Sequence, residues 1–298
     1  MAKISKRTRT KANADTRLKD QQEREFEKPL IGWNVKVVLL FSQLLRENSL
    51  SFTIPDNLVV DLRAILNDHY LATADVFAGF PVRQEILSPD NIVDMTKRHI
   101  QTAILALISV NIETHANSIV NTTNNDMARA ITDARAMQEG DFNQTGFLRM
   151  FLRSRVSTRS MTETQFAAEG TRRILDDNTR QELGSNLDNW DSLDADGKKE
   201  TEELADLSPA VSADDIEQDM SVESAGLIAS VLQRNLKQWV TMGDGKVRTS
   251  HKFTNGQTVP INQVFIVGSG ATLMFPGDGS FGAPIKDLAN CRCYCAYL

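Results

Sequence analysis

The sequence predicts an α+β protein: a mainly helical N-terminal region followed by a C-terminal domain of helices with a small, mostly antiparallel β-sheet. Apolar residues recur at helical spacing through most of residues 33–240, and this period is lost after Trp239. Only 6% of the 298 residues are aromatic, which favours helices packed through Leu, Ile, Val and Ala. With 41% hydrophobic and 24% charged residues, the chain should be mostly globular.

Residues 1–28 are polar and predict a basic flexible arm or a solvated helix. Seven lysines or arginines and one acid precede residue 20, although the whole chain carries a net charge of -6. Such an arm could bind the phosphates of genomic DNA without reading its sequence, or could dock on a partner protein. The candidate contact residues are Lys3, Lys6, Arg7, Arg9 and Lys11.

Residues 29–140 predict a helical domain. Pro29 and Gly32 mark its start, and Gly79 is expected to end a helix that begins at Pro55-Asp56. Ser88-Pro89-Asp90 combines a capping serine, a proline suited to the first helical position and an acid in the first turn. Helices are expected at 37–45, from 56, from 90 to about 121 and at 125–138. The longest apolar run, 103–110, is far shorter than the ~20 residues that a bilayer requires, so no membrane contact is expected.

Residues 141–298 predict the second domain, with an acidic insertion at about 183–223. Fourteen acids and two bases fall between residues 182 and 223. Helices are expected at 142–182 and 224–240, with short ones near 200–207 and 213–220. Asn255-Gly256 predicts a hairpin turn. Strands are expected at 264–267, 272–275 and 291–297.

An ordered series of short motifs runs through the last sixty residues. Its members are Trp239, Asp244, Val247-Arg248, His251, Asn255-Gly256, Phe265, Phe275-Pro276-Gly277-Asp278 and Asn290-Cys291-Arg292-Cys293. This series resembles the C-terminal domain of the Mu F-like minor head proteins, also called the phage head morphogenesis family. Residues 155–164 (RVSTRSMTET) resemble the helix that precedes the series in that family. The wide acidic segment and the third cysteine, Cys295, depart from the family's pattern.

The resemblance implies a structural minor capsid protein of a tailed bacteriophage, present in the virion in multiple copies and assembled in the host cytoplasm. Its expected partners are the portal protein, the major capsid protein or both, and its expected role is head assembly without catalysis, with a part in genome packaging or ejection left open. One alternative is an internal or ejected protein that contacts DNA through the basic arm. Another is a nuclease or other hydrolase delivered with the genome, using Asp244, Arg248 and His251 as acid, cation and base. No second carboxylate at a matching spacing supports this hydrolase set, and a structural role for the three residues, in a turn and in bonds to loop carbonyls, is favoured.

The three cysteines offer the one candidate metal site. Cys291, Cys293 and Cys295 alternate along a predicted strand, so their side chains should share one face, with neighbouring sulfurs ~6–7 Å apart. His251 could complete a zinc site if its turn packs on this strand. Because Cys-x-Cys-x-Cys is not a common zinc spacing, buried thiols beside a hydrogen-bonded histidine are the favoured interpretation, and no other cofactor is expected. His69, His99 and His115 are expected at the surface or at an interface.

Overall fold

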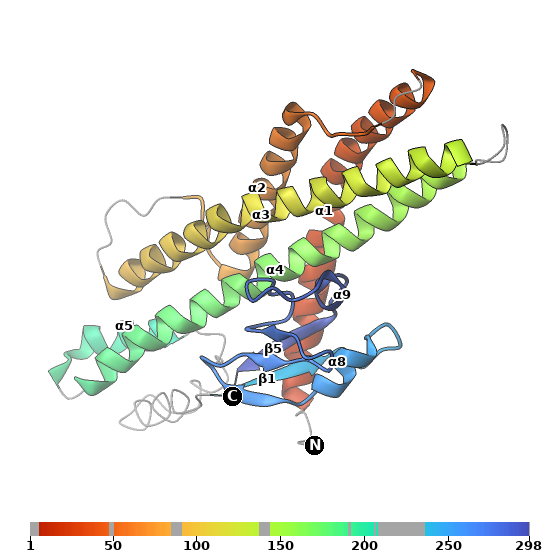
Figure 1. Ribbon diagram of the computed structural model, residues 1–298. Coiled ribbons are helices and arrows are strands. Elements are labelled where there is room, and N and C mark those ends of the chain that lie inside the picture. Colours follow the sequence, from red (N-terminus) through yellow and green to blue (C-terminus); the bar gives the residue numbers. More distant parts are fainter. Residues whose placement is uncertain are drawn as a thin grey trace.

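The computed structural model describes residues 6–47, 51–84, 91–136, 144–189, 192–205, 207 and 236–297, and for some helical residues, including 6–15, the backbone alone. It is mostly helical with a small antiparallel sheet, which confirms the predicted fold class. The helices are α1 (Lys6–Arg46), α2 (Asp56–Ala78), α3 (Ile92–Ala136), α4 (Gln144–Asp188) and the shorter α5 (Ala195–Ala205). Helices α3 and α4 run antiparallel and side by side, and α1 and α2 cross them (Figure 1).

For the part of residues 1–28 that the structure describes, helix α1 corrects the prediction of a flexible arm and bears out the alternative of a helix, although this helix is partly buried. The helix passes through Pro29 without ending, and Phe26, Leu30 and Trp33 are buried on one of its faces. A proline inside a helix removes one backbone hydrogen bond, and the burial of these large side chains outweighs that cost. The expected start of a domain at Pro29 and Gly32 is therefore wrong.

Local start and stop signals placed α2 correctly. Pro55 precedes its first residue, and Gly79 ends it with a φ of 74°, a conformation that glycine adopts without strain. In contrast, the two helices expected at about 90–121 and 125–138 form the single helix α3. Residues 85–90 and 137–143, which include the expected cap at Ser88, lie outside the described residues.

Helix α3 is the one described helix that is long and apolar enough to cross a membrane by length and composition. The segment is Ile92–Asp133, and 28% of its most apolar stretch is buried. Core helices of soluble proteins pass the same criterion, and α3 packs against α2, α4 and α5. Part of α3 therefore presents apolar side chains at the surface of the fold, and Val110 is 71% exposed.

One hydrophobic core continues across the domain boundary expected at residue 140. It includes Phe41 of α1, Leu66 of α2, Ile104 of α3 and Phe166 of α4, together with Trp239 near the other end of the chain. Helix α4 contacts α1, α2 and α3, so it is the central helix of the bundle.

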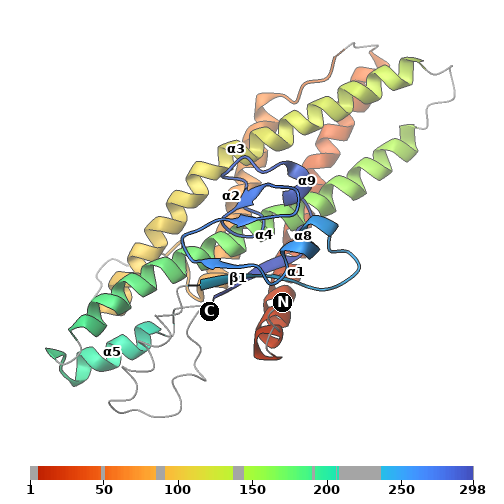
Figure 2. The same ribbon diagram turned by 60° about the horizontal axis from the view of Figure 1, so that its bottom comes forward.

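The C-terminal residues form a compact module on α4 and the N-terminal half of α1 (Figure 2). Its elements are β1 (Leu236–Thr241), α8 (Thr249–Thr254), β2 (Thr258–Pro260), β3 (Phe265–Ile266), β4 (Thr272–Leu273), α9 (Ile285–Leu288) and β5 (Cys293–Tyr297). The main sheet has the order β2-β1-β5 and is antiparallel, with Trp239 opposite Cys295. Strands β3 and β4 form a separate antiparallel pair.

Two expectations for this module need correction. Of the helix predicted at 224–240, residues 236–240 belong instead to the central strand β1, and residues 224–235 lie outside the described part. The turn at Asn255-Gly256 exists, with Gly256 at a φ of 83°, but it joins helix α8 to β2 rather than two strands. Within the predicted acidic insertion, residues 183–188 still belong to α4, α5 covers part of the remainder, and residues 208–223 are not described.

Candidate metal centre and its surroundings

The motif residues of the C-terminal series meet in one packed unit. The ring of Trp239 in β1 is fully buried and packs edge to face on the rings of His251 and Phe265. The distances between ring centroids are 5.2 Å to His251 and 5.3 Å to Phe265. Cys291 and Cys293 are buried beside them. Trp239, His251, Cys291 and Cys293, which are spread over more than fifty residues of sequence, therefore form a single cluster in space.

Arg248 and Asp244 hold the loops of this module together. The guanidinium of Arg248, the residue just before α8, donates hydrogen bonds to the carbonyl oxygens of Lys286 and Ala289. Asp244 accepts a hydrogen bond from the backbone N–H of Lys246 at 3.1 Å and pairs with Arg292 at 3.0 Å. The expected turn at Asp244 and the expected bonds from Arg248 to loop carbonyls are confirmed.

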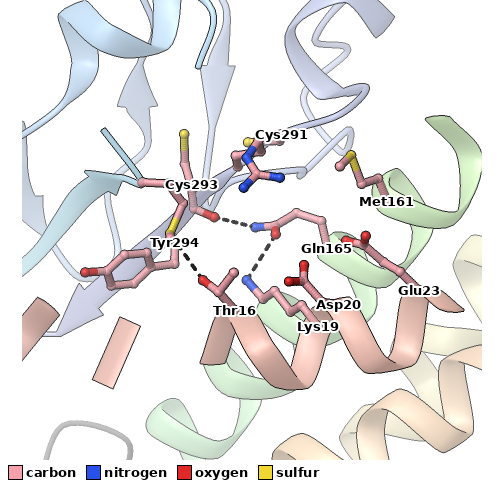
Figure 3. Close-up of a pocket in the computed structure, with 11 residues that line it drawn as sticks. Thr16, Lys19, Asp20, Glu23, Met161, Gln165, Cys291, Cys293 and Tyr294 are labelled. Carbon is pink, nitrogen blue, oxygen red and sulfur yellow. Dashed lines mark hydrogen bonds between the residues drawn. The ribbon is translucent and has the colours of Figure 1, made fainter. Parts of the chain in front are cut away.

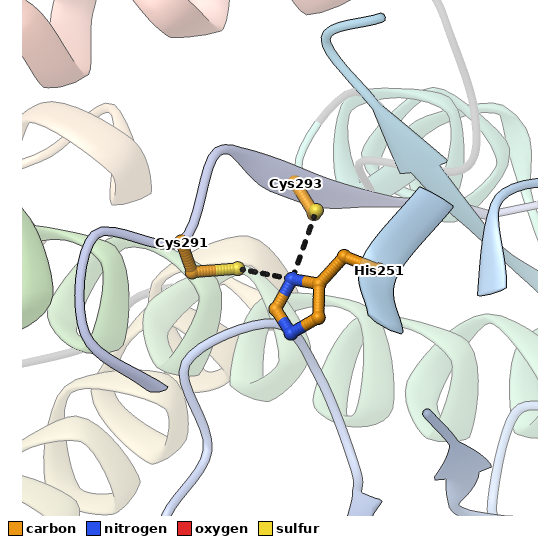
Figure 4. A group of neighbouring side chains, drawn as sticks. All are labelled: His251, Cys291 and Cys293. Carbon is orange, nitrogen blue, oxygen red and sulfur yellow. Dashed lines mark hydrogen bonds between the residues drawn. The ribbon is translucent and has the colours of Figure 1, made fainter. Parts of the chain in front are cut away.

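His251 faces two sulfur atoms. Its Nδ1 atom lies 3.5 Å from Sγ of Cys291 and 3.4 Å from Sγ of Cys293 (Figure 4). The three potential ligand atoms all lie within 4.8 Å of one another, and all three residues are buried. The expected bond from His251 to a loop carbonyl is thus replaced by contact of its Nδ1 with sulfur.

Cys295 does not join this cluster, so the four-residue set predicted from the sequence becomes three. Strand β5 begins at Cys293, and Cys291 lies before it, directly after Asn290, whose φ is 54°. This bend, rather than strand alternation, brings the first two sulfurs together. Cys295 instead lies next to Glu169 of α4, whose carboxylate accepts a hydrogen bond from the Cys295 backbone N–H at 3.3 Å.

The three thiols have different electrostatic surroundings. Burial raises the pKa of Cys291, but hydrogen bonds from Cys293 and His251 outweigh burial and bring that pKa to about 5. For Cys293, burial and the neighbouring Cys291 raise the pKa well above its usual value. Burial and the carboxylate of Glu169 likewise raise the pKa of Cys295. The pair near His251 therefore has one acidic thiol, and Cys295 favours its neutral form.

The hydrolase interpretation required Asp244, Arg248 and His251 to act on one substrate. In the structure Asp244 pairs with Arg292, Arg248 binds two carbonyl oxygens, and His251 contacts sulfur. Each of the three side chains is thus committed to a different partner, and the geometry gives the hydrolase interpretation no support.

A buried polar network in the bundle was not foreseen. Glu163 of α4 accepts a hydrogen bond from the hydroxyl of Tyr70, and its Oε2 lies 2.7 Å from Nδ1 of His115. His69 is also buried: its Nε2 lies 2.8 Å from Oγ1 of Thr164, and its ring stacks on Phe26. The expectation of surface positions is wrong for His69 and also for His115, which is largely enclosed by this network. His99 is more exposed, with an exposed side-chain fraction of 59%.

These contacts set the charge states of the network. Burial raises the pKa of Glu163, but His115 and Tyr70 outweigh it and lower that pKa. Burial lowers the pKa of His115, but the facing carboxylate of Glu163 raises it overall. For His69, burial dominates and lowers the pKa to about 3. The network therefore favours an ion pair between Glu163 and His115 beside a neutral His69.

Gln165 of α4 links this bundle to the C-terminal module (Figure 3). Its amide donates hydrogen bonds to the carbonyl oxygens of Cys293, at 2.8 Å, and Pro276, at 3.2 Å. Lys19 of α1 donates to Gln165 at 3.0 Å and pairs with Glu169 at 2.5 Å. These bonds surround a cavity of about 30 Å³, room for roughly one or two water molecules.

The cavity lies between the Glu23 carboxyl group of α1 and the backbone of Cys293. Burial raises the pKa of Glu23, on the α1 wall, to about 7. The sulfur of Cys293 points away from the cavity, while its carbonyl points in (Figure 3). The cavity thus has charged residues of α1 on one wall, while Met161, Met242 and Cys291 also line it.

Comparisons with family models, with known proteins and with solved structures give no match for this chain. The resemblance to the Mu F-like minor head proteins stays a prediction from the motif series. Contact of the basic residues with DNA or a partner also stays a prediction. Lys3 lies outside the described residues, and the side chains of Lys6, Arg7, Arg9 and Lys11, at the start of α1, are not described.

Proposed function

We propose that this chain is a structural minor head protein of a tailed bacteriophage, bound near the portal or on the inner capsid surface and assisting head assembly. The observation that carries the proposal is the ordered motif series from Trp239 to Cys293. Its members serve as packing residues, turn residues and loop anchors within one module. That use fits an architectural role for the motif better than a catalytic one.

The arrangement of the two motif segments adds support. Residues 155–164 and the closing Asn290-Cys291-Arg292-Cys293 each resemble a separate part of the family's pattern. In the structure they touch: the backbone N–H of Asn290 donates to Oγ1 of Thr162 at 3.3 Å, and its side-chain amide donates to Oγ1 of Thr158 at 3.4 Å. Segments that a family pattern pairs in sequence are expected to share one structural unit, and here they do.

Exposed apolar side chains fit a protein that assembles with partners. Ile31, Val35 and Leu39 follow one another at four-residue intervals on α1, and Leu39 is 64% exposed. Residues at this spacing share one helix face, so they form an apolar stripe on the outside of the bundle. Stripes of this kind favour protein–protein contact, and the proposed contact is with the portal or major capsid protein.

Coexpression with the portal protein and the major capsid protein of the same virus tests this proposal. The wild-type chain should copurify with one of them, and Leu39→Glu should weaken that association because it places a charge in the stripe. Phe253→Glu, an equally exposed apolar position on α8, is the matched control and should leave the association intact. Failure of the folded wild-type chain to associate with either protein would contradict the proposal.

The concentration of basic residues before residue 20 supports DNA contact as a second candidate function. Replacing Lys3, Lys6, Arg7, Arg9 and Lys11 by glutamine should strongly weaken DNA binding at low salt and make the remaining binding less dependent on salt, because phosphate contacts release counterions. Replacement of the exposed Lys199 and of the half-buried Lys198, both in the acidic region, by glutamine is the control. Equal DNA binding by wild type and the five-residue variant would rule out this arm as the DNA contact.

A further inference from the structure

We propose that His251, Cys291 and Cys293 bind one Zn²⁺ ion through Nδ1 and the two sulfur atoms, with a water molecule as the fourth ligand. The inference concerns the chemistry of the C-terminal module and does not depend on the proposed head function. Its ion would join helix α8 to the start of strand β5.

The two distances from Nδ1 of His251 to the sulfur atoms match those that a tetrahedral zinc ion imposes. Zinc binds imidazole nitrogen at ~2.0–2.1 Å and thiolate sulfur at ~2.3 Å, so tetrahedral geometry places nitrogen and sulfur ~3.6 Å apart. The two separations in the structure are 3.5 Å and 3.4 Å. The two sulfur atoms lie within 4.8 Å of one another, so an ion could enter the cluster with small shifts of the side chains.

The scaffold holds the ligands in place by contacts of its own. Arg248 ties the start of α8 to the carbonyl oxygens of Lys286 and Ala289, directly before the segment that carries Cys291. The ring of Trp239 packs edge to face on the ring of His251. Because the ligands are already gathered by these contacts, binding needs little ordering of the chain.

The ligand types select the metal. Two thiolates and one imidazole are soft to borderline donors, which favour zinc over magnesium or calcium. The cluster contains one histidine and two cysteines within the described residues, so it supplies three of four tetrahedral positions. Three protein ligands with a solvent ligand is an established arrangement for zinc.

Cys295 provides a control within the same strand. It is as buried as Cys293 and lies two residues further along β5, but its thiol is not part of the cluster. The proposal therefore distinguishes two neighbouring cysteines: Cys293→Ser should remove a ligand, and Cys295→Ser should not.

Metal content of the purified full chain is the first measurement. Protein prepared under reducing conditions and without chelator should contain about one zinc per chain, and Cys295→Ser should contain the same amount. Cys291→Ser and Cys293→Ser should bind zinc about 10-fold or more weakly. Folding of each variant is checked by circular dichroism. Folded wild-type protein that neither contains nor takes up zinc would overturn the proposal, as would equal loss of zinc in Cys293→Ser and Cys295→Ser.

A second measurement avoids the variants, in case one of them fails to fold. Co²⁺ added to zinc-free wild-type protein should produce the near-ultraviolet charge-transfer absorption of thiolate-bound cobalt, and Zn²⁺ should displace it. Chelator should lower the unfolding temperature, and Zn²⁺ but not Mg²⁺ should restore it. An absent cobalt–thiolate band together with an unfolding temperature indifferent to zinc would show that the cluster is a metal-free group of packed thiols.

Discussion

The helical bundle and the C-terminal module each bury a polar cluster, and the two clusters differ in the partners that their histidines meet. In the bundle, the buried carboxylate of Glu163 accepts hydrogen bonds from the charged His115 and from the neutral hydroxyl of Tyr70. In the module, His251 meets two sulfur atoms, which are weak hydrogen-bonding partners. The difference indicates that the bundle uses its polar groups for pairing, whereas the arrangement in the module suits a metal ion.

The largest effect should come from breaking the network in the bundle. Glu163→Ala leaves Tyr70 and His115 buried without their shared acceptor, and we expect unfolding to become easier by about 3–5 kcal/mol. Denaturant unfolding measures this change. Lys36→Gln, which breaks the exposed pair with Asp61, is the control and should cost no more than ~1 kcal/mol. Similar small losses in both variants would mean that the buried network contributes no more than a surface ion pair.

A smaller effect is expected at the junction between bundle and module. Gln165→Ala leaves the carbonyl oxygens of Cys293 and Pro276 without their donor, for an expected loss of about 2 kcal/mol. The loss should be accompanied by faster proteolysis within residues 236–297, because this side chain makes two of the hydrogen bonds that hold the module to α4. Gln21→Ala, an exposed glutamine on α1, should change neither property. A module equally protected in both variants would show that apolar packing alone docks it.

The free energy of unfolding should decrease at acidic pH in a way that depends on His69. Its pKa is about 3 in the folded protein and near 6.5 when unfolded, so the unfolded state takes up a proton first as the pH falls. Stability is therefore lost from about pH 6.5 downwards, by roughly 2 kcal/mol at pH 5. The groups that face His69, Glu163 and Thr164, stay unchanged in His69→Gln. His115 also stays unchanged, and its raised pKa makes stability increase as the pH falls, opposite to the effect of His69. The variant should therefore show a flatter acid limb, and an identical slope in both proteins would exclude His69 as the cause.

Local signals explain what the sequence could predict. Pro55 and Gly79 restrict or permit particular backbone conformations at their own positions, and for this reason they located the two ends of α2. Gly256 likewise marked a turn correctly, although not the element before it. Strand β1 was missed because four consecutive residues, Lys237 to Val240, are buried in a central strand, and such a run lacks the alternation by which strands are identified.

The candidate sites show the same limit. The motif series placed His251, Cys291 and Cys293 close together, but only the bend at Asn290 decides which cysteines share the histidine. The network at Glu163 involves residues 93 and 48 positions away in sequence. No spacing rule connects them, because their meeting is set by how α2, α3 and α4 pack. A tyrosine in an apolar helix and a glutamate within the family-like helix were the only signals available.

Locating the chain in an intact particle tests the central claim most directly. We predict that a reconstruction of purified, DNA-filled heads of the phage proposed to encode the chain will show several copies of the long α3–α4 pair beside the portal or on the inner face of the shell. Mass spectrometry of the same heads should detect the chain. Heads that are complete and infectious but contain no copy of the chain would contradict the proposal that it is a structural minor head protein.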